Sequence, residues 1–72
     1  MVSVVEMPAA DREALESMAR SQTLPHRKVM QSKALLRLAD GCSVRSTAAE
    51  LGTYPNTIAR WRDRYRTGGV DA

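Results

Sequence analysis

The sequence predicts an all-α fold of four helices, in which the last three form a compact trihelical unit. Apolar residues recur at spacings of three and four in four separate stretches, which is the periodicity of amphipathic helices. Each stretch begins at a residue that favours a helix start, and glycine follows the later ones. The start signals are Pro8, Pro25, Ser43 and Pro55, and the stop signals are Gly41, Gly52 and the pair Gly68-Gly69. With 72 residues, the chain makes one small domain that buries only about 60% of its surface.

The first two predicted helices supply packing surface. We expect a flexible arm over residues 1–7, followed by a helix from Pro8 to about Arg20. The apolar face of this helix consists of Leu15, Met18 and Ala19, with Ala14 beside them. The second helix is expected from Pro25 to about Ala39. Its apolar face consists of Val29, Ser32, Leu35, Leu36 and Ala39, with Leu38 at the margin.

The pattern of a helix-turn-helix follows in the stretch Cys42–Arg66. The apolar positions of the two helices are Val44, Ala48 and Leu51 in the first, and Ile58, Trp61 and Tyr65 in the second. A small side chain at Ala48 lets the two backbones approach, and Gly52 takes the left-handed conformation of the turn without steric cost. This spacing predicts a helix-turn-helix. We assign residues 8–72 to one such domain, with the second helix over about residues 55–67.

The charge of the chain is unevenly distributed. The formal net charge is +3. Residues 1–24 contain two arginines and four acidic residues, whereas residues 25–72 contain nine lysines or arginines and four acidic residues. The basic part therefore coincides with the helix-turn-helix pattern, as expected for a module that binds nucleic acid. A basic face that is merely solvated is the alternative interpretation of the charge alone.

Several classes of function lack support in the sequence. Cys42 is the only cysteine, so an internal disulfide and a cysteine-based zinc site are both excluded. The acidic residues stand singly and no glycine-rich phosphate loop is evident, so we expect no catalysis, metal, cofactor or small-molecule ligand in this chain. No apolar run approaches the roughly 18 residues that span a bilayer, and the start is not a signal peptide. We expect a cytoplasmic protein that does not contact membranes.

The start of the fourth helix is the expected reading surface for double-stranded DNA. An α-helix fits the major groove, where each base pair presents its own donors and acceptors. Asn56 suits adenine and Arg60 suits guanine, because each makes a bidentate contact with that base. Thr57 could contact a thymine methyl or a phosphate, while Trp61 is expected in the core rather than stacked on a base. The candidate base contacts are Tyr54, Pro55, Asn56, Thr57 and Arg60.

Other polar residues are expected to contact the DNA backbone. Such contacts determine the position of a protein on DNA rather than the sequence that it reads. The candidates are Arg45, Thr47, Arg62, Arg64, Arg66 and Lys33. Asp63 lies on the same outward face as Asn56 and Arg60. We expect it to pair with Arg60 or Arg66; the alternative is that it accepts a hydrogen bond from a cytosine amine.

A set of short motifs matches one known family in combination. They are Pro25-His26-Arg27, a leucine-rich helix ending in Ala39-Asp40-Gly41, Ala49 and Leu51-Gly52, Asn56-Thr57-Ile58, Trp61 and Gly68-Gly69. In these motifs the chain resembles the N-terminal DNA-binding region of bacterial insertion-sequence transposases of the mariner superfamily. Tyr54 and Pro55 depart from the usual serine and basic residue, and Asp63 interrupts an arginine-rich run. The resemblance implies a homeodomain-like helix-turn-helix that binds the terminal inverted repeat of a mobile element.

We therefore expect sequence-specific binding of double-stranded DNA by part of a transposase, whose catalytic domain lies outside this chain. The oligomeric state stays open at this point. A free-standing transcription regulator of the same fold is the first alternative. A helical protein-interaction domain, in which the basic face is incidental, is the second.

Overall fold

The computed structural model describes residues 5–70, and this part of the chain forms four helices and no strand. The helices are α1 (Ala9–Ala19), α2 (His26–Ala39), α3 (Val44–Leu51) and α4 (Pro55–Gly68). The all-α prediction is confirmed. Pro8 and Pro25 have extended backbone and directly precede their helices, whereas Pro55 is the first residue of α4. Helix α4 includes Gly68 and therefore runs slightly beyond its predicted end.

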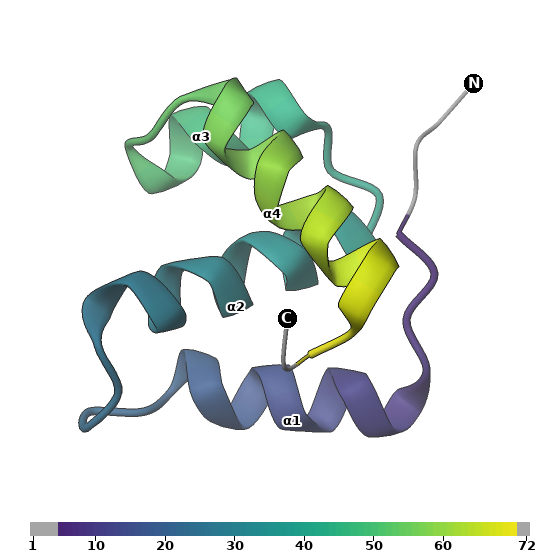
Figure 1. Ribbon diagram of the computed structural model, residues 1–72. Coiled ribbons are helices and arrows are strands. Elements are labelled where there is room, and N and C mark those ends of the chain that lie inside the picture. Colours follow the sequence, from purple (N-terminus) through teal and green to yellow (C-terminus); the bar gives the residue numbers. More distant parts are fainter. Residues whose placement is uncertain (1–4, 71–72) are drawn as a thin grey trace.

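Helix α2 is the central element of the molecule. It contacts each of the other three helices, with α1 along one side and with α3 and α4 on the other (Figure 1). The residues that it buries are Ser32, Ala34, Leu35 and Leu38. The predicted apolar face was thus too narrow, because Ala34 and Leu38 are fully buried while Leu36 is only partly buried. A helix that is covered from two sides buries residues outside a single stripe.

Helices α3 and α4 pack together through the predicted turn. The Oγ of Ser43 accepts a hydrogen bond of 3.0 Å from the amide of Ser46 and thereby caps α3. Gly52 ends the helix with φ 70°, in the left-handed region. Across the turn the amide of Thr53 donates to the carbonyl of Ala48 at 2.9 Å, as in a Schellman motif. Ala48 itself is buried, which fits the expected close approach of the two helices.

One side of α4 faces the core. Ile58, Trp61 and Tyr65 are 0%, 8% and 7% exposed, so the predicted apolar face of this helix is confirmed and Trp61 is a core residue. Burying one large apolar side chain contributes about 1.5–3 kcal/mol. Three such side chains on one stripe therefore determine how α4 is rotated about its own axis. They pack in a cluster with Leu15, Leu35, Leu38 and Ala48.

The segment before α1 also belongs to the folded domain. Val5 is 2% exposed, and Met7 packs partly buried against the core. At these two positions the structure differs from the flexible arm that was expected over residues 1–7. The physical reason is that both side chains are apolar and remove surface of a small core from water. The remainder of the expected arm, residues 1–4, lies outside the described part of the chain.

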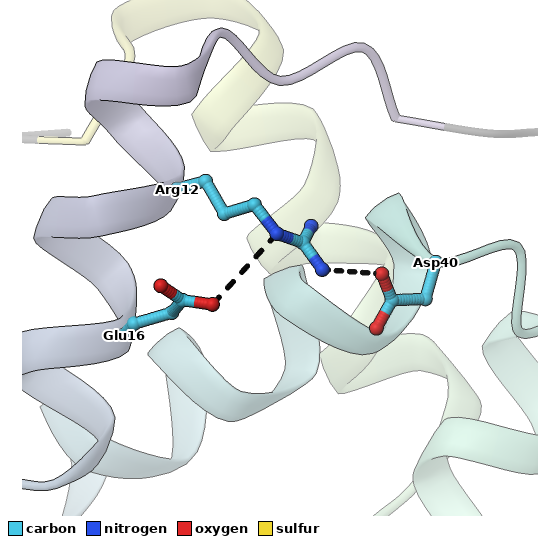
Figure 2. Close-up of polar contacts among 3 residues, drawn as sticks. All are labelled: Arg12, Glu16 and Asp40. Carbon is cyan, nitrogen blue, oxygen red and sulfur yellow. Dashed lines mark hydrogen bonds and ion pairs between the residues drawn. The ribbon is translucent and has the colours of Figure 1, made fainter.

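Two adjacent residues connect α1 to the other helices. Arg12 pairs with Asp40 at the end of α2 and lies 3.8 Å from Glu16 within α1 (Figure 2). The hydrogen bond to Asp40 raises the pKa of the Arg12 guanidinium. Asp11 accepts a hydrogen bond of 2.7 Å from the hydroxyl of Tyr65 in α4. Since the Arg12 pair is exposed to water, its main effect is to orient α1 rather than to add stability.

Gly52→Ala should lower the free energy of unfolding by about 1 kcal/mol, because a residue with a Cβ is strained in the left-handed conformation. No atom lies within 4 Å of a Cβ added there, so the cost comes from the backbone alone. Urea unfolding followed by circular dichroism measures it. Gly68→Ala is the matched control, since Gly68 is helical without a positive φ and should be neutral or stabilising there. Equal losses in both variants would contradict the assignment.

Tyr65→Phe should lower the free energy of unfolding by about 1 kcal/mol, because Asp11 then loses its hydrogen-bond donor. A double-mutant cycle with Asp11→Ala isolates this contribution.

Burial and the bond to Asp11 raise the pKa of Tyr65 from 10.0 to about 12. The folded state therefore holds this proton more tightly than the unfolded state does. The stabilisation should be complete below pH 10.0 and be lost as the pH rises towards about 12. If the wild type and Tyr65→Phe lost stability equally over that range, the coupling would be absent.

Candidate nucleic-acid interface

The side of α4 that is turned away from the core forms one continuous open surface, which we call the outer face. It is lined by Asn56, Ala59, Arg60, Asp63, Arg64, Thr67 and Gly68. Asn56, Arg60, Asp63 and Thr67 follow one another at spacings of four, three and four, so they share one stripe along the helix. Ile58, Trp61 and Tyr65 are buried on the other side. The core packing of α4 thus keeps the outer face in solvent.

The candidate base contacts lie at the start of this helix. Tyr54, Pro55, Asn56 and Arg60 are exposed, and Thr57 is partly buried. Tyr54 occupies the N-cap position without a capping side-chain hydrogen bond and is 76% exposed. Asn56 and Arg60 lie on the outer face, and Tyr54 and Pro55 lie at its N-terminal end. The contact of these five residues with bases stays a prediction.

The candidate backbone contacts are spread over different sides of the domain. Arg64 is the only one of these six candidates that lines the outer face. Lys33 lies beside Arg37 and Glu50 in a hollow of about 390 Å³ between α2 and α3. Arg66 lies beside Asp11 and Tyr65 on the side that faces α1. Arg45 is exposed on α3, whereas Arg62 is partly buried. The six predicted residues therefore do not form a single patch.

Carboxylates pair mainly with the cations that connect helices. Arg37 pairs with Glu50 and joins α2 to α3, as Arg12 joins α1 to Asp40. Within residues 5–70, no ion pair involves the other exposed cations around the helix-turn-helix. They include Lys33, Arg45, Arg60, Arg64 and Arg66. Cations without a carboxylate partner are free to exchange small counterions for phosphates.

The prediction that Thr47 contacts the DNA backbone is wrong. Thr47 is 1% exposed, and its buried hydroxyl has no hydrogen-bond partner in the described part of the chain. It directly precedes the buried Ala48, at the edge of the apolar stripe of α3. Packing of α3 against both α2 and α4 covers this edge. Since a threonine side chain carries a methyl group, it fills such a position at the cost of one unsatisfied hydroxyl.

The predicted pairing of Asp63 is also wrong. The Nε of Arg62, rather than Arg60 or Arg66, donates to Oδ1 of Asp63 at 3.2 Å. The Arg62 side chain is 21% exposed and the Asp63 side chain is 65% exposed. Arg62 is restricted by the surface against which it lies, so pairing costs it less side-chain entropy than it would cost a fully solvated arginine.

The sequence interpretation overlooked three residues of the outer face. They are Ala59, Thr67 and Gly68. Thr67 continues the spacing of Asn56, Arg60 and Asp63 by one more turn, so the same periodicity would have indicated it. Its hydroxyl donates to the carbonyl of Asp63 at 3.0 Å. Ala59 and Gly68 are small, and they leave the backbone of α4 close to the surface.

Residues 5–70 contain neither a cluster of metal-binding side chains nor a helix that could span a membrane. In residues 5–70, no group of three or more histidine, cysteine, aspartate or glutamate side chains is arranged to hold a metal ion. Within the same range no helix has the length and apolar character needed to cross a bilayer. Cys42 is a free, partly buried thiol.

Thr47→Val should raise the free energy of unfolding by about 1 kcal/mol, because it removes a buried hydroxyl that lacks a partner and keeps the shape of the side chain. Thermal unfolding measures this change. The same variant should bind DNA with unchanged affinity, since the side chain is covered. A clear loss of DNA affinity in a variant that is as stable as the wild type would restore Thr47 as a backbone contact.

Comparison with known proteins agrees with this geometry. The family model described as homeodomain-like domain matches residues 25–72, a range that contains α2, α3 and α4 but not α1. Comparison with curated proteins and with solved structures gives no significant match. The matched family is a DNA-binding helix-turn-helix family that is found in transposases. Because the match includes the whole trihelical unit, the chain belongs to the homeodomain-like domain family.

Proposed function

We propose that this chain binds double-stranded DNA sequence-specifically, with α4 as its recognition helix. The observation that carries the proposal is the open outer face, which lies opposite the buried Ile58, Trp61 and Tyr65. Membership of a DNA-binding helix-turn-helix family supports it. In helix-turn-helix complexes the second helix enters the major groove, and its first residues meet base edges.

The start of α4 supplies the proposed base contacts. Asn56 is exposed and its amide both donates and accepts, which matches the N6 and N7 groups of adenine. Arg60 follows one turn later and has no ion pair within residues 5–70, so its guanidinium is free to donate to O6 and N7 of guanine. Tyr54 and Pro55 contact the same groove at its edge, and Thr57 contacts a phosphate or a thymine methyl.

The exposed cations around the helix-turn-helix are the proposed backbone contacts. Arg64 lines the outer face and Arg45 lies on α3. Lys33 lies in the hollow between α2 and α3, and Arg66 lies on the side that faces α1. Arg62 can add to this group through the nitrogens of its guanidinium that Asp63 does not engage. Each neutralised phosphate releases counterions, so affinity should fall steeply and linearly on a plot of log K against log salt.

For the biological role, we propose the DNA-binding region of a transposase that recognises the terminal inverted repeat of its element. The resemblance of the chain to insertion-sequence transposases supports this role, as does the occurrence of the matched family in transposases. A small transcription regulator of the same fold would use the same surface. The arrangement of target sites in the genome distinguishes the two roles, because an element carries its repeats as an inverted pair.

Selection of bound duplexes from a random pool is the experiment that tests the proposal. All 72 residues are used, and the selected motif is located in the genome of the source organism. Paired inverted copies at the ends of one element would support the transposase role, whereas single copies beside promoters would support the regulator. Failure to enrich any motif, together with binding that is insensitive to salt, would reject DNA recognition and favour a protein-interaction domain.

Arg60→Ala should weaken binding to the selected duplex by about 1–3 kcal/mol and relax the preference at one base pair. The reason is loss of a bidentate contact to one guanine. Fluorescence anisotropy at fixed salt, with each base of the motif varied in turn, measures this effect. Arg20→Ala is the matched control, since Arg20 is exposed beyond the end of α1 and its removal changes the charge equally. An unchanged base preference in Arg60→Ala would remove Arg60 from the reading surface.

A further inference from the structure

Asp63 is the only acidic residue in α4, and it stands among four arginines. Its side chain is 65% exposed and lies on the outer face between Arg60 and Thr67. A carboxylate in this position is repelled by the phosphates of any DNA that approaches. A surface that only neutralised phosphates would bind more tightly without it. A hydrogen-bond donor on the DNA would offset this repulsion, so Asp63 is suited to a base that presents such a donor.

The major groove offers such a donor on two bases, of which only one suits a carboxylate. Cytosine presents the N4 amine alone. Adenine presents its N6 amine beside the N7 acceptor, and this lone pair opposes a second carboxylate oxygen. Guanine and thymine present acceptors at their edges. Among the four bases, cytosine is thus the one whose groove edge complements Asp63.

The carboxylate of Asp63 is already oriented in the structure. Its Oδ1 accepts from Nε of the partly buried Arg62 at 3.2 Å, and no other side-chain hydrogen bond to this carboxylate occurs within residues 5–70. The neighbouring hydroxyl of Thr67 donates to the backbone carbonyl of Asp63, so it does not compete for the carboxylate. The small residues Ala59 and Gly68 on the same face leave room for a base edge to approach.

The spacing along α4 matches the spacing of base pairs. A helix rises about 1.5 Å per residue, so Arg60 lies roughly 6 Å and Asp63 roughly 10.5 Å beyond Asn56 along the axis. Base pairs stack about 3.4 Å apart. A helix that lies along the groove therefore brings Asp63 to a base about three steps from the one that Asn56 meets. We infer that Asp63 is a specificity-determining residue that accepts a hydrogen bond from a cytosine of the target site, an inference that rests on the proposed DNA binding.

The test is selection of duplexes from a random pool by the full chain and by three variants at this position. The wild type should enrich a cytosine about three base pairs from the adenine assigned to Asn56. Replacing this cytosine should weaken wild-type binding by about 5- to 150-fold. Asp63→Glu should keep the cytosine. Asp63→Asn should favour adenine there, because an amide suits adenine, and Asp63→Ala should accept every base at this position while the rest of the motif persists.

Removal of an equal charge elsewhere provides the control. Glu13 is exposed on α1, so Glu13→Gln should leave the whole motif unchanged, and melting curves verify that each variant is folded. If the wild type enriches a motif that Asp63→Asn and Asp63→Ala reproduce at every position, the inference is overturned while DNA recognition stands. If the wild type enriches no motif at all, the proposed function itself fails, and the inference fails with it.

Discussion

The side chains of Ile58, Trp61 and Tyr65 leave α4 on one side and enter a core that α1, α2 and α3 complete. This packing is the constraint on which the candidate interface depends. Once three large side chains are buried on one stripe, the rotation of the helix is determined, and polar residues a half-turn away must face water. Asn56, Arg60 and Asp63 are therefore displayed together by a consequence of core packing. The turn at Gly52 then determines where α4 begins relative to α3.

Helix α1 extends the domain beyond the region that the family model matches. It adds Leu15 to the core and, through Asp11, accepts a hydrogen bond from Tyr65 of α4. The extension has a clear physical basis, since the chain has one tryptophan, two tyrosines and no phenylalanine. A trihelical unit with so few aromatic residues has little apolar surface to bury. Leu15 from α1 and Val5 from the preceding segment enlarge the core.

Some arginines of the described residues form ion pairs between helices, and others have no carboxylate partner. Asp40 and Glu50 pair with arginines of other helices, so these cations help to orient α1, α2 and α3. The arginines of the outer face are left without such partners within residues 5–70. Asp63 is the one carboxylate of α4, and its ion pair does not join two helices. Its neighbour Arg62 donates to only one of its two oxygens. The charge pattern of α4 is thus better suited to a specific ligand than to uniform attraction of phosphates.

Local chemistry in the sequence determined most of the architecture. The proline and serine start signals, Gly52 and the stripe of Ile58, Trp61 and Tyr65 act over a few residues, so their positions predicted the helices and the side of α4 that faces outward. The tertiary structure alone decided how α2 is covered, that Thr47 is buried, that Val5 joins the core, and which arginine holds Asp63. These features depend on the positions of several helices in space. Periodicity along a single helix carries no information about what its neighbours cover, and the partner of a charged side chain depends on how the surrounding surface restricts each candidate.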